Sequence, residues 1–191
     1  MSVPEMHEEL PEFVKVEGND IFFYCEVCEE SVAELVRAVK KLELETRVSL
    51  TKLGLYDQMP HVTIHIRSDG GDLYAGLAAM DFLQNADVHV TTVGEGCVAS
   101  AATFIFLGGD VRLIRRHAYV LIHQIGSDLW GKYEDLKAEM VQNDRIMRDL
   151  KRIYLRETNL PEHKLAKMLK RDVYLSYRKC VKYGVVTDLI G

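Results

Sequence analysis

The chain has 191 residues, of which 48% are hydrophobic and 28% are charged. This length and composition fit one globular domain with a full core, residues 1–191, and exclude a largely disordered chain. The formal net charge of -5 excludes a general attraction to nucleic acid or to an anionic membrane surface.

The N-terminal segment, residues 1–20, is acidic and lacks the apolar core of a signal peptide. No apolar stretch of the chain approaches the roughly 18 residues that a membrane span needs. Among the four cysteines only Cys25 and Cys28 are close in sequence, which is too few ligands for a zinc site and fits free thiols in a reducing compartment. We therefore expect a cytoplasmic protein that uses no metal and no cofactor.

The first third of the chain predicts strands alternating with helices, which indicates an α/β fold. A strand over residues 21–25 is followed by Ser31 and Glu34, whose spacing is that of a capping box and predicts a helix from Ser31 to about residue 44. The mixed polar residues 45–60 predict an irregular connection. An apolar run at residues 62–66 then predicts a buried strand.

The middle of the chain continues this alternation. The predicted elements are a helix over about 73–83, a strand over 88–93, a helix from Ser100 to about 107, and strands near 111–114 and 119–122. Gly70 and Gly71 follow one strand, Ser100 follows another and His123 follows a third. Open α/β sheets keep their sites at the carboxyl ends of the strands, so we expect these four residues to meet there.

Beyond His123 the pattern predicts a long helix over about 132–157, then shorter helices over about 161–171 and 176–183. Apolar side chains at helical spacing form one stripe on the long helix, namely Leu136, Met140, Met147, Leu150 and Tyr154. A helix of this length projects from a small domain, and an apolar stripe on it needs a partner. Self-association is the simplest way to supply that partner.

The candidate functional residues have the chemistry of an acyl-transfer site. A serine hydroxyl such as that of Ser100 becomes a nucleophile when a neighbouring imidazole, here His123, removes its proton. The imidazole needs an acid to orient it, the role we assign to Asp172. The backbone amides of Gly71 and Ala101 are the candidate oxyanion donors. Each signal alone also has a structural explanation, so the prediction depends on their conjunction.

The motifs that carry these residues resemble the ClpP family of self-compartmentalised serine peptidases, from about residue 21 to residue 190. The segments that resemble the family's Gly-x-Ala-Ala-Ser-Met, His-Gln, Arg-Asp-x-x-Leu-Ser and Tyr-Gly-Leu-Val-Asp motifs are Gly96-Cys97-Val98-Ala99-Ser100-Ala101, His123-Gln124, Arg171-Asp172-Val173-Tyr174-Leu175-Ser176 and Tyr183-Gly184-Val185-Val186-Thr187-Asp188. Their order and spacing also agree with the family.

The resemblance implies a ClpP/crotonase-like core of repeated β-β-α units, with the long helix projecting as the family's handle region at residues 124–158. It implies Ser100 as nucleophile, His123 as general base and then acid, and Asp172 as the residue that orients His123. The oxyanion amides would be those of Gly71 and Ala101.

The resemblance also implies a homo-oligomer of two stacked seven-membered rings, with Arg171 in the contact between rings. Substrates would be unfolded proteins and peptides, supplied by an AAA+ unfoldase. They would align on the strand that follows His123, through Gly126, Ser127, Asp128 and Leu129.

Two family prolines are absent, since the Ser-Pro-Gly-Gly turn is Ser68-Asp69-Gly70-Gly71 here and His-Gln-Pro is His123-Gln124-Ile125. Two other functions remain open: a catalytically inactive ring or scaffold subunit of the same fold, and a crotonase-like acyl-CoA enzyme. Inactive relatives usually lack a triad residue and crotonases lack the serine nucleophile. All three triad positions are filled in this chain, so the serine endopeptidase is the preferred interpretation.

Overall fold

The structure is a computed structural model that describes residues 13–126 and 130–190. Its elements in chain order are β1 (Val14–Glu17), β2 (Asp20–Phe23), α1 (Glu29–Lys52), β3 (His61–Ser68), α2 (Leu73–Gln84), β4 (His89–Ala99), α3 (Ala102–Leu107), β5 (Val111–Arg115), β6 (Tyr119–Ile122), α4 (Tyr133–Glu157), α5 (Glu162–Met168), β7 (Val173–Ser176), α6 (Tyr177–Lys182) and β8 (Asp188–Ile190). The predicted α/β class is confirmed.

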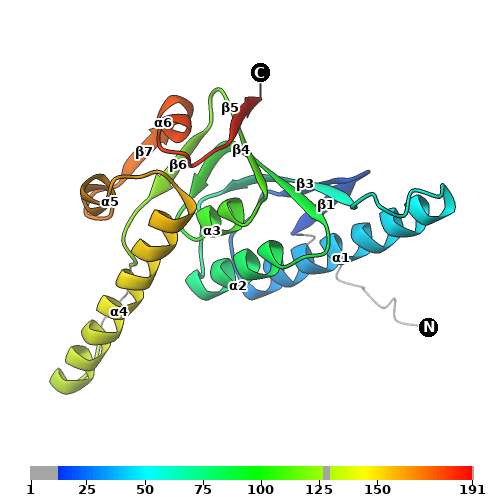
Figure 1. The fold of residues 1–191 in the computed structure, drawn as a ribbon. Coiled ribbons are helices and arrows are strands. Elements are labelled where there is room, and N and C mark those ends of the chain that lie inside the picture. Colours follow the sequence, from blue (N-terminus) through cyan, green and yellow to red (C-terminus); the bar gives the residue numbers. More distant parts are fainter. Residues whose placement is uncertain (1–12, 127–129, 191) are drawn as a thin grey trace, which may run out of the picture.

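The strands form one sheet in the order β1-β2-β3-β4-β5-β8, with β6 beside β4 and β7 beside β6. Neighbouring strands from β2 to β8 along this order are parallel, whereas β1 and β7 run antiparallel to their neighbours. Parallel strands need helical crossovers, and α1, α2 and α3 supply them on one face of the sheet (Figure 1).

Strand β4 has two different neighbours on the same side, and this divides the sheet. Its residues 91–94 pair with β5, whereas its residues 97–99 pair with β6. Strands β6 and β7 therefore extend from the carboxyl end of β4 rather than continuing beside β5. As a result, the end of β4 lies between the main sheet and this extension.

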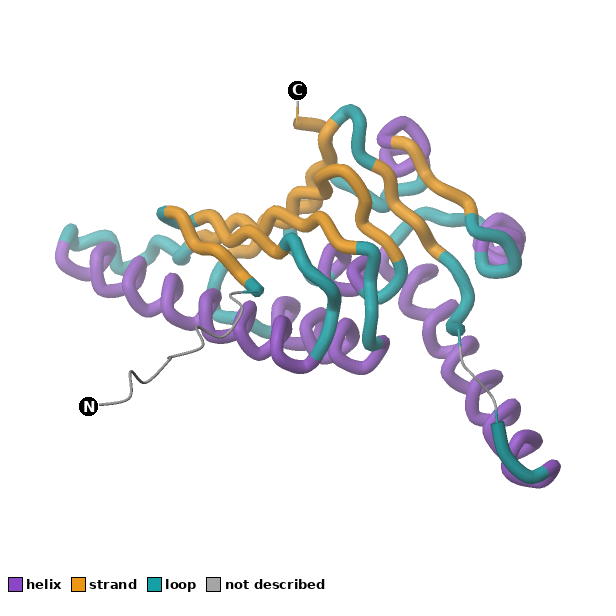
Figure 2. Tube along the Cα trace, turned by 180° about the vertical axis from the view of Figure 1, so that it is seen from behind, coloured by secondary structure: helices purple, strands orange, loops and turns teal. Residues whose placement is uncertain are grey.

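A large part of the core lies between the sheet and the three helices on its covered face (Figure 2), and the rest involves α4, α5 and α6. Strand β3 shows how the sequence produces this arrangement, because Val62, Ile64 and Ile66 are fully buried while the residues between them are partly exposed. This alternation is that of a strand with one packed face. Among the described residues, the buried apolar side chains form one contiguous cluster, whose first member is Val14 in β1 and whose last is Val186.

The first helix differs from its prediction at both ends. It continues to Lys52, so residues 45–52 are helical rather than irregular. The amphipathic pattern is lost from Leu44 onward, since Leu44 and Val48 are both exposed. Residues 45–52 nevertheless contain no glycine or proline, so nothing in them ends the helix. Hydrophobic periodicity alone therefore missed two turns.

At its beginning, α1 is capped by Cys28 rather than by Ser31. The Ser31 amide donates to Cys28 Sγ at 3.5 Å and the Cys28 amide donates to Ser31 Oγ at 3.0 Å, so the two residues form the capping box. Ser31 is fully buried, and its hydroxyl donates to the carbonyl of Glu26 at 2.8 Å. The capping box predicted from Ser31 and Glu34 was wrong by three residues.

Three strands were not predicted, namely β1, β7 and β8. Each has three or four residues, too few for alternation to show in the sequence, and each forms by adding to a neighbouring strand. The helices around β7 are correspondingly shorter than predicted, since α5 ends at Met168 and α6 begins at Tyr177.

Helix α4 projects away from the body, as predicted (Figures 1 and 2). Only Leu150 and Tyr154 are buried among its residues, and Met140 in the apolar stripe is 60% exposed. The stripe therefore packs against the body only near the end of the helix. None of the helices in the described ranges is both long and apolar enough to cross a membrane.

Candidate active site

Ser100 lies in a tight turn between β4 and α3. It has a φ of +54°, and among the described residues it is the only one other than glycine with a positive φ. The prediction that Ser100 opens the helix was wrong, because α3 begins at Ala102. The reason is that the Ser100 amide still donates to the carbonyl of Leu121 on β6 at 3.0 Å, so strand pairing reaches the serine itself.

The turn at Gly70 and Gly71 packs directly against this serine. A Cβ on Gly70 would lie 2.6 Å from the Cβ of Ser100 and 3.1 Å from the amide nitrogen of Ala101. Only glycine permits this approach. The predicted meeting of the glycine pair with the serine turn is confirmed by this contact.

Gly71 is held in place by Val27, the residue that precedes the cap of α1. The Val27 amide donates to the carbonyl of Gly70 at 2.8 Å, and the Asp72 amide donates to the carbonyl of Val27 at 2.7 Å. This pairing does not use the amide of Gly71, which lies between the two bonds. Asp72 then caps α2 through its Oδ1, which accepts from the amide of Ala75 at 2.6 Å.

His123 and Asp172 come together because β7 pairs with β6. The register places Ile122 opposite Val173, so the residue after one strand faces the residue before the other. His123 Nδ1 lies 4.0 Å from Asp172 Oδ1, an ion-pair distance rather than a hydrogen bond. The Asp172 side chain is 76% exposed and that of His123 is 28% exposed, so water competes for the carboxylate.

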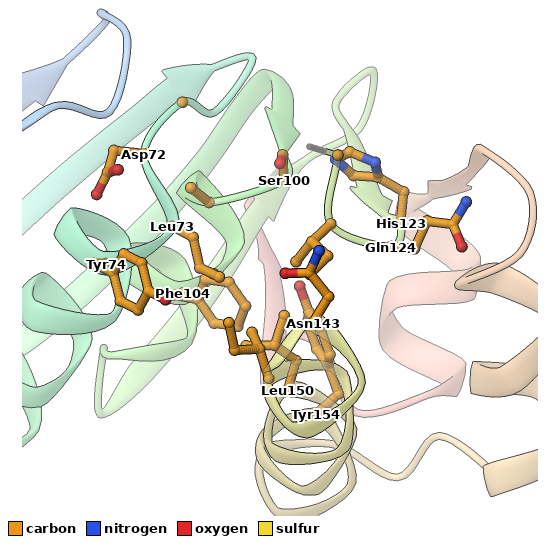
Figure 3. A pocket seen from close by; sticks show the side chains of 15 residues that line it. Asp72, Leu73, Tyr74, Ser100, Phe104, His123, Gln124, Asn143, Leu150 and Tyr154 are labelled. Atoms are coloured by element: carbon orange, nitrogen blue, oxygen red, sulfur yellow. The ribbon is translucent and has the colours of Figure 1, made fainter. Parts of the chain in front are cut away.

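A cavity of about 310 Å³ lies beside these residues. Figure 3 shows Ser100 and His123 at one end of the cavity, with the side chains of α3 and α4 along its wall. The cavity is lined by Gly71, Asp72, Leu73, Tyr74, Ser100, Ala101, Phe104, His123, Gln124, Ile125, Gly126, Asn143, Ile146, Leu150 and Tyr154. In the part of the chain that the structure describes, no hydrogen bond joins Ser100 to His123.

The arrangement suits acyl transfer. Ser100, His123, Gly71 and Ala101 all line the cavity, and Asp172 contacts His123 from outside it. In substrate-free structures such catalytic contacts are often long and shorten when substrate binds. The site therefore has the parts of a serine hydrolase in one place.

Cys97 is the other candidate nucleophile near the turn, three residues before Ser100. Burial raises the pKa of its thiol, and the negative charge of Asp69 raises it further. A thiol with a raised pKa carries little thiolate at neutral pH and is a weak nucleophile. Cys97 also lines a different cavity, on the side of Arg67 and Asp69. It does not compete with Ser100 for this role.

The remaining predicted residues are less well defined. Gly126 is exposed and lines the cavity, but Ser127, Asp128 and Leu129 lie outside the described residues. Arg171 is exposed in the turn before Asp172, where its amide donates to the carbonyl of Met168 at 3.1 Å.

Sequence reasoning missed the apolar wall of the cavity. Phe104 lies in a run that predicted a buried helix, and Leu150 and Tyr154 were assigned to a stripe that faces a partner. It also missed Val27, which acts through its backbone and leaves no signal in the sequence. Thr103, whose hydroxyl donates to the carbonyl of Ser100, was also missed, although the sequence contains a hint of it. It is the polar residue in the otherwise apolar run 101–107, three residues after Ser100.

The comparisons with known proteins agree with this fold. The Clp protease family model matches residues 19–191. A chain named ATP-dependent Clp protease proteolytic subunit from Ostreococcus tauri is 35% identical over 141 residues, which cover 73% of this chain and 70% of the relative. A protein of the same name from Pleurastrum terricola is 29% identical over 199 residues, covering 100% of this chain and 97% of the relative.

Among solved structures, a mutant form of ClpP1 from Listeria monocytogenes superposes with a TM-score of 0.75, at 23% identity. The match covers 91% of each chain and shows that the fold is that of ClpP. The chain belongs to the Clp protease family. Membership confirms the predicted class, a serine peptidase, and does not favour the scaffold or the crotonase-like alternative.

Proposed function

We propose that the protein is the serine endopeptidase subunit of a ring-shaped Clp protease, with Ser100 as the nucleophile. The single observation that carries this proposal is the contact of the Ser100 turn with the glycine turn at one end of a cavity that His123 also lines. This is the arrangement that peptide-bond hydrolysis through an acyl-enzyme requires.

In this mechanism Ser100 Oγ attacks the peptide carbonyl while His123 takes its proton. The carbonyl oxygen becomes an oxyanion, to which the amides of Gly71 and Ala101 donate. When the carbon–nitrogen bond breaks, His123 gives the proton to the leaving amine. Water then attacks the acyl-enzyme while His123 takes its proton, and the ester bond to Ser100 Oγ breaks as His123 returns that proton to Oγ, which releases the acid and restores the serine. Asp172 orients the imidazole and stabilises its charged form.

The nucleophile is tested by labelling with a fluorophosphonate and by cleavage of a fluorogenic peptide. Ser100→Ala should abolish labelling and lower kcat on the order of a million-fold, if the triad acts as a unit as in subtilisin. His123→Ala should abolish labelling although the serine is still present. An assembled protein that neither labels nor cleaves would instead be the inactive ring subunit.

We further propose that the subunits form two stacked heptameric rings in the cytoplasm, with an AAA+ unfoldase supplying unfolded protein. The family and the exposed stripe of α4 support ring formation, and the free cysteines are typical of a reducing compartment. Arg171 is the proposed contact between rings, and the segment from Gly126 through Ser127, Asp128 and Leu129 is the proposed strand for aligning peptides.

Assembly is tested separately from chemistry. Met140→Glu places a charge in the exposed stripe of α4, whereas Gln142→Glu places the same charge off the stripe on the same helix. We expect sedimentation velocity to show a smaller particle for the first variant and no change for the second. A wild-type protein that remains monomeric at working concentration would refute the ring proposal.

A further inference from the structure

A chain of hydrogen bonds connects α4 to the Ser100 turn. Thr103 Oγ1 lies 2.6 Å from the carbonyl oxygen of Ser100 and 2.6 Å from the hydroxyl of Tyr154. A carbonyl oxygen can only accept, so the single hydroxyl proton of Thr103 goes to Ser100. Tyr154 must therefore be the donor to Thr103, and the direction of the whole chain is fixed.

The side chains of Thr103 and Tyr154, which form this series of hydrogen bonds, are both buried. Thr103 is 1% exposed and Tyr154 is 2% exposed, so water does not substitute for either hydrogen bond. Burial raises the pKa of Tyr154, and the phenol therefore keeps the proton that it donates. A buried hydroxyl is stable only when it has such a partner.

Tyr154 is itself held on two further sides. Its backbone carbonyl accepts from the hydroxyl of Thr158 at 2.6 Å, near the end of α4. Its ring packs on that of Phe104 with 5.4 Å between the centroids. The hydroxyl of Tyr154 therefore has little freedom to leave Thr103.

Ser100 needs support because its backbone conformation is unfavourable. A φ of +54° is unfavourable for an L-residue, because its Cβ is then crowded against the backbone. The amide of Ser100 is fixed by Leu121, and its carbonyl accepts from both the amide of Thr103 at 3.0 Å and the hydroxyl of Thr103. The chain from Tyr154 thus acts on the carbonyl side of the residue whose Oγ must point at the substrate.

We propose that Tyr154 and Thr103 are positioning residues, which hold the Ser100 turn in the geometry for attack through the chain Tyr154 OH, Thr103 Oγ1 and Ser100 carbonyl. The inference rests on the proposed role of Ser100 as nucleophile. Each hydroxyl is hydrogen-bonded to the next group of this series, so both act on the proposed nucleophile through the Ser100 carbonyl rather than directly.

The test removes each hydroxyl while keeping the shape of the side chain. Tyr154→Phe and Thr103→Val break the chain, whereas Thr103→Ser keeps it. Tyr133→Phe is the matched control, because it makes the same change at an exposed position of the same helix. The measurements are kcat and KM for a fluorogenic peptide, the rate of Ser100 modification by a fluorophosphonate, and the Tm.

We expect Tyr154→Phe and Thr103→Val each to lower kcat and the modification rate about tenfold, with KM within about twofold, since small misplacements of a nucleophile have effects of this size or larger. Thr103→Ser and Tyr133→Phe should match the wild type. The double variant Tyr154→Phe/Thr103→Val should be no slower than Thr103→Val alone, because either change breaks the same chain.

A purely structural role would lower the Tm and leave kcat and the modification rate unchanged, and that result would overturn the inference. Thr103→Ser losing as much as Thr103→Val would overturn it too. If Thr103→Val does not fold, the kcat of Tyr154→Phe against Tyr133→Phe decides the question. A Ser100→Ala protein that still cleaves peptides would overturn the proposed function instead.

Discussion

Gly71→Ala tests the oxyanion site through a contact that the structure defines closely. Gly71 has a φ of +141°, and an added Cβ would lie 2.2 Å from the carbonyl oxygen of Val27. Real Cβ contacts do not fall below 3.0 Å, so the segments around Gly71 and Val27 must separate by at least about 0.8 Å. The oxygen atom concerned belongs to the backbone and not to the end of a flexible side chain. The Val27 carbonyl also accepts from Asp72, so the whole turn moves with it.

A displacement of this size is enough to remove an oxyanion donor. Misplacement of a catalytic group by about 1 Å can cost about a hundredfold in rate. Loss of one oxyanion donor costs about 10²- to 10³-fold in kcat, or roughly 3 to 4 kcal/mol of transition-state stabilisation. We expect a fall of this size in kcat for a fluorogenic peptide, with KM little changed because the apolar wall of the cavity is untouched.

Gly18→Ala is the matched control for backbone strain. Gly18 also has a positive φ, +61°, but a Cβ there would meet nothing within 4 Å, and the residue lies in the turn between β1 and β2. It should destabilise the fold by about 1 to 2 kcal/mol and leave kcat unchanged. If Gly71→Ala folds normally and keeps its kcat within about threefold of the wild type, the amide of Gly71 is not an oxyanion donor.

Three further predictions concern charge and protonation. Asp172→Asn should lower kcat, but by no more than about 10⁴-fold, because the carboxylate is exposed and lies 4.0 Å from His123. A variant with the kcat of the wild type would show that Asp172 is not a triad residue. Burial alone would raise the pKa of Glu95, but hydrogen bonds from Tyr24, His65 and Arg115 bring it below its usual value. These hydrogen bonds therefore stabilise the folded protein fully above the ordinary pKa of glutamate, and their contribution is lost as the pH falls through the lowered pKa. In urea unfolding between pH 3 and 7, the free energy of unfolding of Glu95→Gln should fall less steeply with decreasing pH than that of the wild type. Equal slopes would contradict this. Burial raises the pKa of Cys25 to about 11, with a smaller contribution from the nearby thiol of Cys28. Iodoacetamide at pH 8 should therefore modify Cys25 about a hundredfold more slowly in the folded protein than in urea. Equal rates of modification would refute this prediction.

The parts of the fold that the sequence predicted are those with a strong local pattern. Helix α4 and strand β6 were found nearly at their observed ends, since the first has many turns of amphipathic spacing and the second is a compact apolar run. The meeting of Ser100, His123 and the glycine pair was predictable because strand ends converge in an α/β sheet.

The parts that were missed depend on contacts between distant segments. Strand β7 has four residues and exists because β6 offers an open edge, yet it is β7 that brings Asp172 to His123. The pairing of Val27 with the glycine turn involves only backbone atoms, so no side chain records it. Motif resemblance supplied Asp172 where local pattern could not.

The supports of the three proposed triad residues differ in kind, and this difference explains the geometry of the site. Ser100 and His123 depend on the same strand, because β6 accepts from the serine amide through Leu121 and carries the histidine two residues later. Their relative position is therefore set by one short piece of backbone around the buried Ile122. Asp172 depends on a second strand, because it directly precedes β7, whose pairing with β6 brings it to His123, and its side chain is 76% exposed to water. The proposed nucleophile and base therefore share one strand as their support, whereas the proposed acid depends on a second strand paired to the first.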